Sequence, residues 1–247
     1  MLKNEKIHDL PVVILAGGFG TRISENKSSL PKGLVKIGND PIIYHIIKYF
    51  KAYGLKKFII CTGYKQKYIK NYFDKNKKFE DLKILIIYTG LKSNTGLRIK
   101  KIKKLINKNF FLTYCDGLSN INLNILFKKF NKSKKLGILT AVNPQSRFGI
   151  LSIKGEENIY NFDEKTKLFN IWINAGYYIF NKKIFDYIKG KNPIFEKETL
   201  KNVAKKKLII SYKHGGFWKC MDTIKDRKEL ISIWKHKRKK IPWKIWK

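Results

Sequence analysis

A set of residues suited to binding phosphate lies near the start of the chain. Three glycines at positions 17, 18 and 20 follow a run of four apolar residues that begins at Val12. A loop this rich in glycine can adopt positive φ angles and bring bare backbone N–H groups close to a ligand. Thr21 and Arg22 follow with a hydroxyl and a planar guanidinium, and Lys32 adds a second positive charge. The pattern predicts a cradle for an anionic ligand at the end of a buried strand.

Two widespread phosphate-binding loops do not match this stretch. A Walker A loop requires Gly-Lys followed by Ser or Thr, whereas Gly20 is followed by Thr21 and Arg22. The dinucleotide fingerprint would begin at Gly18, and Ile23 stands where its third glycine belongs. Glycines alone also occur in ordinary strand-to-helix turns. The added Thr-Arg pair and the later Pro-Lys pair favour a ligand-binding loop.

Two aspartates can supply the carboxylates that a metal-dependent reaction on phosphates needs. Asp116 follows a predicted strand at 110–114, and Asp222 directly precedes a predicted final helix at 223–235. Mg²⁺ prefers one or two carboxylates together with phosphate oxygens. Taken alone, an aspartate at a strand end or a helix start is more often a cap than a metal ligand.

The elements that must position these residues alternate between strands and helices, which predicts an α/β fold. We expect a Rossmann-like, mostly parallel sheet with helices on both faces, in which ligands bind beyond the carboxyl ends of the strands. Between 147 and 180 the helical signals disappear, so we expect a smaller mixed or antiparallel portion there. The expected strands are 12–15, 56–63, 82–90, 110–114, 136–142 and 208–212, and the expected helices are 41–54, 65–73, 95–106, 122–134, 181–188, 195–206 and 223–235.

The composition is that of one sizeable domain. The chain has 247 residues, of which 43% are hydrophobic, and we expect a single domain at 1–236 followed by a basic aromatic tail at 237–247. No apolar run reaches about 18 residues, so no membrane span is expected. The first residues lack the apolar stretch of a signal peptide, and three cysteines form no paired framework. A cytoplasmic, reduced protein is the simplest interpretation.

The net charge of +36 raises the question of nucleic-acid binding. Only five of the 54 basic residues are Arg, although Arg is the usual residue for recognising bases and phosphates. The lysines are spread along the whole chain, which favours a charged surface over a dedicated nucleic-acid site. We therefore expect no nucleic-acid partner. For the tail HKRKKIPWKIWK, packing on the body or on another subunit is favoured over binding to an anionic membrane.

The stretch LAGGFGTR followed by PK resembles the signature loop of the sugar-1-phosphate nucleotidyltransferases, which make nucleotide sugars. The resemblance implies that the glycine loop holds the nucleotide, that Arg22 contacts the triphosphate, and that Lys32 bridges phosphates of both substrates. The residues TYCDG and FWKCMDT resemble the two metal-aspartate motifs of this family, which implies that Asp116 and Asp222 bind Mg²⁺.

Further site residues are carried over from the same resemblance. SNTGLRIK resembles a TGGR segment that contacts the nucleotide, with Leu97 in place of a glycine. Glu164 and Lys165 in NFDEKT resemble a Glu-Lys-Pro segment that contacts the sugar and its phosphate, although a solvated surface pair is the alternative. Asn174 in WINAGYYIF resembles a sugar-side element. The implied nucleotide-binding residues are Leu15, Ala16, Gly17, Gly18, Phe19, Gly20, Thr21, Arg22, Lys32, Thr95, Arg98 and Cys115.

Within this family the chain is most similar to the glucose-1-phosphate cytidylyltransferases, from end to end. The segments GYKQKYIKNYF, RFG, GFW and PWKIW carry this similarity, and a shorter stretch between Phe73 and Leu82 departs from it. The resemblance implies an Mg²⁺-dependent enzyme that forms CDP-glucose and pyrophosphate from CTP and α-D-glucose 1-phosphate, and a homo-oligomer. The same chemistry with another nucleotide or sugar 1-phosphate is the nearest alternative, and a non-catalytic nucleotide-sugar or RNA-binding protein is a second.

Overall fold

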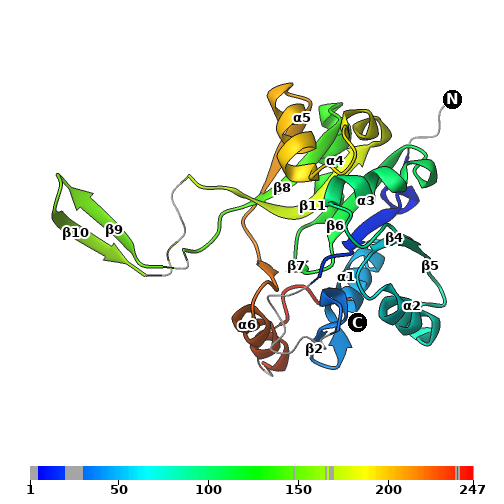
Figure 1. Ribbon diagram of the computed structural model, residues 1–247. Coiled ribbons are helices and arrows are strands. Elements are labelled where there is room, and N and C mark those ends of the chain that lie inside the picture. The colour runs from blue at the N-terminus through cyan, green and yellow to red at the C-terminus, as the bar shows by residue number, and fades with distance from the viewer. Residues whose placement is uncertain are drawn as a thin grey trace.

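A seven-stranded sheet forms the centre of the protein in the computed structural model (Figure 1), with the strand order β12-β8-β11-β6-β1-β4-β5. The structure describes residues 5–19, 30–146, 148–164, 166, 170–236, 238 and 240–246. Within these residues, β11 is antiparallel to both of its neighbours and every other pair in the sheet is parallel. The predicted α/β class, the mostly parallel sheet and the small antiparallel portions are confirmed.

The strands and helices follow the alternation expected from the sequence. The strands are β1 (Val12–Ala16), β2 (Lys36–Ile37), β3 (Asp40–Pro41), β4 (Lys57–Thr62), β5 (Lys83–Tyr88), β6 (Asn109–Tyr114), β7 (Gly117–Ser119), β8 (Gly137–Val142), β9 (Ile150–Lys154), β10 (Asn158–Asp163), β11 (Ile173–Asn181), β12 (Ile209–His214) and β13 (Trp218–Cys220). The α-helices are α1 (Ile42–Lys51), α2 (Gln66–Asp74), α3 (Thr95–Lys101), α4 (Leu123–Ser133), α5 (Lys201–Lys205) and α6 (Ile224–Lys235).

Strand β1 is buried on both faces, as its continuous apolar sequence requires. Val12 and Ile14 belong to one core cluster, and Val13 and Leu15 belong to the other. This alternation follows from the two-residue period of a strand that has packed layers on both sides. Packing on both faces therefore fixes the position of the strand, and the glycine loop that follows it lies at the carboxyl edge of the sheet.

Four of the expected helices differ in detail. The helix expected at 181–188 is a 3₁₀ helix at Lys182–Tyr187. Pro41 has an extended backbone (φ −68°, ψ 156°), so Asp40 and Pro41 form β3, and α1 begins one residue later than predicted. The helix expected at 95–106 ends at Lys101, and a short 3₁₀ helix at Lys103–Leu105 follows it. The helix expected at 195–206 begins as a π-helix at Phe195–Leu200 before α5.

The short antiparallel pair β7–β13 brings two distant parts of the chain together beside the sheet. Gly117 of β7 pairs with Cys220 of β13, and the backbone N–H of Met221 donates to the carbonyl oxygen of Asp116 at 2.8 Å. Asp116 directly precedes β7, and Met221 alone separates the end of β13 from Asp222. The pairing therefore places the two predicted metal-binding aspartates next to each other.

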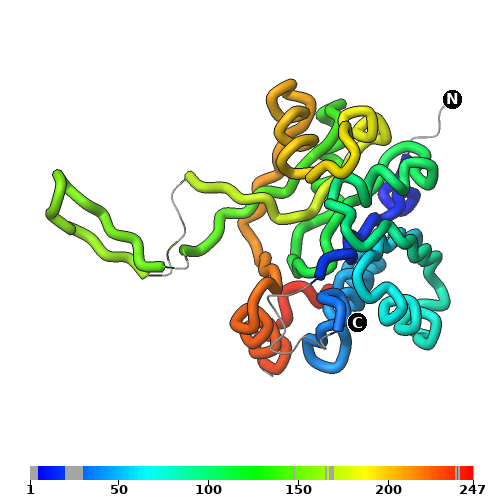
Figure 2. The backbone as a smooth tube through the Cα atoms, in the orientation of Figure 1, coloured from blue at the N-terminus to red at the C-terminus, as the bar shows by residue number. Residues whose placement is uncertain are grey.

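The last described residues of the chain pack against α1 and α6. Trp243 is fully buried and stacks on Trp234, and its indole N–H donates to Nδ1 of His45 at 3.4 Å. Strands β9 and β10 form a separate hairpin that projects from the body (Figure 2). Among the described residues, no helix is both long and apolar enough to cross a membrane.

Candidate active site

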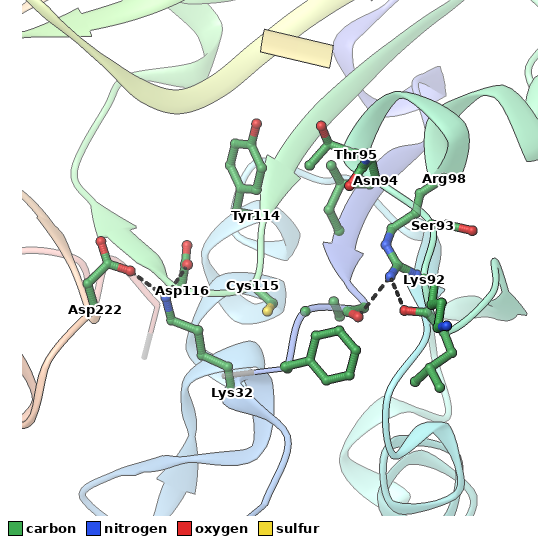
Figure 3. A pocket seen from close by; sticks show the side chains of 16 residues that line it. Lys32, Lys92, Ser93, Asn94, Thr95, Arg98, Tyr114, Cys115, Asp116 and Asp222 are labelled. Atoms are coloured by element: carbon green, nitrogen blue, oxygen red, sulfur yellow. Dashed lines mark hydrogen bonds and ion pairs between the residues drawn. The ribbon is translucent and has the colours of Figure 1, made fainter. Parts of the chain in front are cut away.

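A cavity of about 550 Å³ opens at the carboxyl ends of β1 and β6, as expected for a sheet of this type. Two groups of side chains face each other across it (Figure 3): the carboxylates of Asp116 and Asp222 lie at one end, and Arg98 lies at the other. The predicted residues that line the cavity are Leu15, Ala16, Gly17, Gly18, Phe19, Lys32, Thr95, Arg98, Cys115, Asp116 and Asp222.

Lys32 joins the two aspartates at the carboxylate end of the cavity. Its Nζ lies 2.6 Å from Oδ2 of Asp116 and 2.6 Å from Oδ1 of Asp222. Burial alone would lower the pKa of Lys32, but the two carboxylates outweigh it and raise that pKa above its usual range. The side chain is therefore a fixed cation between two anions (Figure 3).

Local structure positions Lys32 and Asp222. Lys32 begins a 3₁₀ helix that ends at Leu34, directly after Pro31. Asp222 lies before the capping box of α6, and its backbone N–H donates to Oδ2 of Asp226 at 3.2 Å. The thiol of Cys220 donates to Oδ2 of Asp222 at 3.4 Å. One contact thus holds the backbone of Asp222, and the other holds its carboxylate.

The donor set is compatible with a magnesium ion. Two carboxylates already converge on one cation, the Lys32 ammonium, at hydrogen-bonding distance. The described residues form no cluster of three or more His, Cys, Asp or Glu side chains that could hold a metal. Mg²⁺ commonly binds to one or two carboxylates and takes its remaining ligands from water and substrate phosphates. Asp116 and Asp222 fit that pattern.

Arg98 connects the loops that follow three neighbouring strands of the sheet. Its Nη1 donates to the carbonyl oxygens of Thr62 at 2.9 Å and Gly90 at 2.9 Å, and to Oγ1 of Thr89 at 2.8 Å. Its Nη2 donates to the carbonyl oxygen of Gly17 at 2.9 Å. These contacts use the planar fork of the guanidinium to hold the glycine loop against the ends of β4 and β5.

Two adjacent glycines of the loop meet different surroundings. A Cβ atom added to Gly17 would overlap the guanidinium of Arg98, whereas a Cβ added to Gly18 would find nothing within 4 Å. Gly17 is therefore required by packing inside the protein. Gly18 leaves its backbone open to the cavity, as a residue that a ligand approaches closely would.

A chain of hydrogen bonds links Thr95, at the Arg98 end of the cavity, to Asn174. Oγ1 of Thr95 donates to Oε2 of Glu196 at 2.7 Å, and the hydroxyl of Tyr114 donates to the other oxygen of Glu196. The Tyr178 hydroxyl donates to that of Tyr114 at 3.4 Å and accepts from the amide of Asn174. Asn174 therefore lies outside the cavity lining and is connected to it through Tyr114.

Other predicted residues are not brought to the cavity or cannot be placed. Glu164 directly follows β10, at the base of the projecting hairpin, and does not line the cavity. Gly20, Thr21, Arg22 and Lys165 lie outside the described residues.

Several residues at the cavity were not predicted. Tyr114 lines it directly before Cys115, at a strand end where a ligand contact could have been expected from position alone. Residues 91–94 also line it, after β5. Glu196 contacts the lining residues Thr95 and Tyr114 from a π-helix far along the chain, and no sequence pattern points to it.

Comparisons with known proteins agree with this arrangement. A family model described as nucleotidyl transferase matches residues 11–226. The chain is 34% identical to the glucose-1-phosphate cytidylyltransferase of Salmonella typhimurium, over 96% of this chain and 100% of that protein. It is 37% identical to the probable glucose-1-phosphate cytidylyltransferase of Bacillus subtilis, over 96% of this chain and 100% of that protein. A solved structure of a putative glucose-1-phosphate thymidylyltransferase from Bacillus anthracis is similar in fold, with a TM-score of 0.73 and 17% identity over 95% of this chain and 98% of that one.

Proposed function

This chain belongs to the nucleotidyl transferase family, and from that premise we propose that it couples CTP and α-D-glucose 1-phosphate to form CDP-glucose and pyrophosphate. The choice of base and sugar is supported by the identity, over almost the whole chain, to two cytidylyltransferases. The observation that carries the chemistry is the convergence of Lys32, Asp116 and Asp222 at one end of the cavity that the glycine loop also lines.

The proposed reaction is a single displacement at phosphorus. An oxygen of the sugar phosphate attacks the α-phosphorus of CTP, and the bond from that phosphorus to the oxygen bridging to the β-phosphate breaks. Pyrophosphate leaves with that bonding electron pair, so no oxidant, reductant or further reactant is needed. Because the reactants carry their own chemistry, the protein contributes mainly position and charge neutralisation.

Each group at the cavity has a role in this proposal. The backbone from Leu15 to Phe19 receives the nucleotide, and Arg98 keeps that backbone in place through the carbonyl of Gly17. Lys32 neutralises the phosphates of both substrates. For Arg22, the expected contact with the triphosphate stays a prediction from the resemblance.

Asp116 and Asp222 would hold the magnesium ion. When bound, the ion would neutralise charge on the phosphate oxygens of the reacting groups. Without substrates, the two carboxylates contact the ammonium of Lys32. The substrate phosphates would therefore compete with Asp116 and Asp222 for this ammonium. The site thereby keeps its charges paired before substrates enter.

The sugar side of the proposal rests on Glu164, Lys165 and Asn174. Asn174 is connected to the cavity through Tyr178 and Tyr114, so a sugar phosphate bound near Tyr114 would lie within reach of this network. Glu164 has no such connection in the described residues. Its role in sugar binding stays a prediction.

A matrix of four nucleoside triphosphates and several sugar 1-phosphates tests the proposal. We expect Mg²⁺-dependent pyrophosphate release to be fastest for CTP with glucose 1-phosphate. Faster release with another pair would replace the substrates and keep the reaction class. No release with any pair would favour the non-catalytic nucleotide-sugar or RNA-binding protein.

The matrix needs a control for contaminating enzymes from the expression host. Asp222→Asn removes a proposed metal ligand, and we expect it to slow the release by roughly 10²–10³-fold. Asp186→Asn changes an exposed aspartate that forms a surface ion pair with Lys103, and we expect it to behave as the wild type. Equal release by both variants would show that the activity does not come from this cavity.

A further inference from the structure

Glu196 contacts two side chains of the cavity wall without lining the cavity itself. It lies in the π-helix Phe195–Leu200, outside the set of described residues that line the cavity. One of its carboxylate oxygens accepts from Oγ1 of Thr95 at 2.7 Å, and the other accepts from the hydroxyl of Tyr114. An ionised carboxylate has no proton to donate, so both hydroxyls direct their protons toward Glu196.

The hydroxyl of Thr95 has a second fixed partner. The backbone N–H of Phe195 donates to Oγ1 of Thr95 at 2.9 Å, and a backbone N–H can only donate. The hydroxyl thus gives its proton to Glu196 and one lone pair to Phe195, which leaves one lone pair unused. Thr95 therefore offers the cavity an acceptor and no donor.

The backbone on both sides of Thr95 is held by the segment that precedes Glu196. The backbone N–H of Gly96 donates to the carbonyl oxygen of Pro193 at 3.0 Å, and a Cβ atom added to Gly96 would lie 2.8 Å from that oxygen. The backbone N–H of Asn94 donates to Oδ1 of Asn192 at 2.7 Å. Because both neighbours of Thr95 are anchored, the position of its hydroxyl is fixed with them.

Tyr114 is restricted in the same way. Burial raises the pKa of Tyr114 well above its usual value, with smaller contributions from Tyr178 and Glu196, so its hydroxyl keeps its proton. That proton goes to Glu196, and the hydroxyl of Tyr178 donates to the oxygen of Tyr114 at 3.4 Å. Both hydroxyls that Glu196 contacts therefore act as acceptors toward any other group.

Thr95 lies at the end of the cavity at which a bound nucleotide would place its base. Lys32, Asp116 and Asp222 lie at the opposite end, and they are the groups suited to phosphates and a metal (Figure 3). In the proposed function the triphosphate binds at that end. The base then extends toward the wall formed by Thr95 and Arg98.

Cytosine and uracil differ in the group that such a wall can distinguish. Cytosine carries an amino group at its 4-position, which donates, whereas uracil carries a carbonyl oxygen there, which accepts. An acceptor on the protein forms a hydrogen bond with the amino group. Against uracil the same acceptor faces another acceptor, and neither group gains a partner.

We propose that Glu196 determines base specificity: by taking the proton of Thr95, it makes that hydroxyl an acceptor for the 4-amino group of cytosine. The inference rests on the proposed function, in which CTP is the nucleotide. Glu196 acts through Thr95, so it is a positioning residue. Because a free hydroxyl could also donate to the 4-oxygen of uracil, Glu196 selects against UTP as well as for CTP.

Nucleotide binding without a sugar phosphate tests the proposal, because it requires no turnover. The three ligands are CTP, UTP and the triphosphate of pyrimidin-2-one riboside, which lacks the 4-amino group. We expect the wild type to bind CTP at least about tenfold more tightly than either of the other two. Isothermal titration calorimetry in the presence of Mg²⁺ gives the three dissociation constants.

Truncation of Glu196 tests its effect on the hydroxyl. Glu196→Ala frees the proton of Thr95, and we expect it to reduce the preference for CTP over UTP at least about fivefold. The matched control is Glu198→Ala in the same π-helix, because Glu198 also accepts a hydrogen bond, from the backbone N–H of Ile194 at 2.8 Å. This control should keep the wild-type preference.

Two variants of Thr95 test the contact with the base directly. Thr95→Val removes the hydroxyl and keeps the shape, so CTP should bind no more tightly than the triphosphate of pyrimidin-2-one riboside. Thr95→Ser keeps the hydroxyl and should keep the ratio of the two dissociation constants. These variants test the same contact if Glu196→Ala proves unstable by circular dichroism.

Three results would overturn the proposal. They are equal binding of CTP and UTP by the wild type, equal binding of CTP and the triphosphate without the amino group, and a folded Glu196→Ala that keeps the full preference. The proposed function fails separately. Selective CTP binding without pyrophosphate release would contradict the reaction and support this inference, whereas fastest release with UTP would keep the reaction class and overturn this inference.

Discussion

The side-chain nitrogen of Lys32 lies 2.6 Å from a carboxylate oxygen of Asp116. A second carboxylate, from Asp222, lies at the same distance from that nitrogen. The residue expected to neutralise substrate phosphates is thus paired with the two residues expected to hold Mg²⁺. In the proposed reaction, substrate and metal binding would both rearrange these three charges, so we expect the two binding events to depend on each other.

Removing either carboxylate should reduce catalysis strongly. We expect Asp116→Asn and Asp222→Asn each to lower kcat/KM by roughly 10²–10³-fold, the scale measured for single electrostatic contacts to a transition state. Pyrophosphate release at saturating Mg²⁺ measures the effect, with Asp186→Asn as the surface control. Near wild-type turnover in Asp116→Asn would remove that residue from the metal site.

The two neighbouring glycines should respond differently to the same substitution. Gly17→Ala forces Arg98 to move and should destabilise the protein by about 1–3 kcal/mol, as overpacking typically does. Gly18→Ala meets no neighbouring atoms, so the stability should change by less than about 0.5 kcal/mol while nucleotide affinity falls. Chemical denaturation and nucleotide titration separate the two effects. The reverse order of stabilities would contradict the packing described for Gly17.

Arg98 should act as a positioning residue. Arg98→Lys keeps the charge but loses the planar fork, so carbonyl groups at the ends of β1 and β4 lose their donors at about 1–3 kcal/mol each. We expect a lower unfolding temperature and a raised KM for the nucleotide, with a smaller change in kcat. Arg227→Lys is the matched control, since Arg227 makes one long contact at an exposed carbonyl. A variant with wild-type stability and a selective loss in kcat would indicate direct contact with the reacting phosphates instead.

Much of the fold follows from sequence pattern because its determinants are local. The apolar runs that begin at Val12 and end at Tyr114 predict the neighbouring strands β1 and β6. Asp116, just after the second run, indicates the edge of the sheet at which the site lies. The contact of Lys32 with two aspartates could not be predicted in the same way. It depends on the β7–β13 pairing, which joins parts of the chain that no local signal connects.

Arg98 and the hairpin of β9 and β10 show two further limits. The partners of Arg98 are mostly backbone carbonyls, which every residue carries, so residue types alone cannot reveal them. A mixed or antiparallel portion was expected between 147 and 180, but the exposure of β9 and β10 was not. Alternation of apolar residues is the same whether the partner lies within the chain or outside it.

Acidification should destabilise the packing of the C-terminal segment. Burial lowers the pKa of His45 below its usual value, although the carbonyl of Ile37 and the charge of Asp40 oppose this. Nδ1 of His45 accepts from the indole of Trp243, which can only donate, so the neutral form fits the site. The unfolded state then binds the proton more readily, and stability is lost as pH falls below about 6.5.

Urea unfolding between about pH 7.5 and pH 5 measures this loss. His45→Gln should flatten the pH dependence, while the contribution of His214 remains, because burial also lowers the pKa of that residue. Tryptophan fluorescence should report the change, since Trp243 and Trp234 stack beside His45. An equally steep pH dependence in His45→Gln would assign the effect to other groups.

The proposed reaction is tested most directly by following labelled oxygen from one substrate into the products. Glucose 1-phosphate with ¹⁸O in its phosphate is incubated with CTP, Mg²⁺ and the protein, and both products are analysed by mass spectrometry. Attack by the sugar phosphate on the α-phosphorus predicts CDP-glucose that retains the label and pyrophosphate that carries none. Labelled pyrophosphate, or the absence of CDP-glucose, would contradict the proposed function.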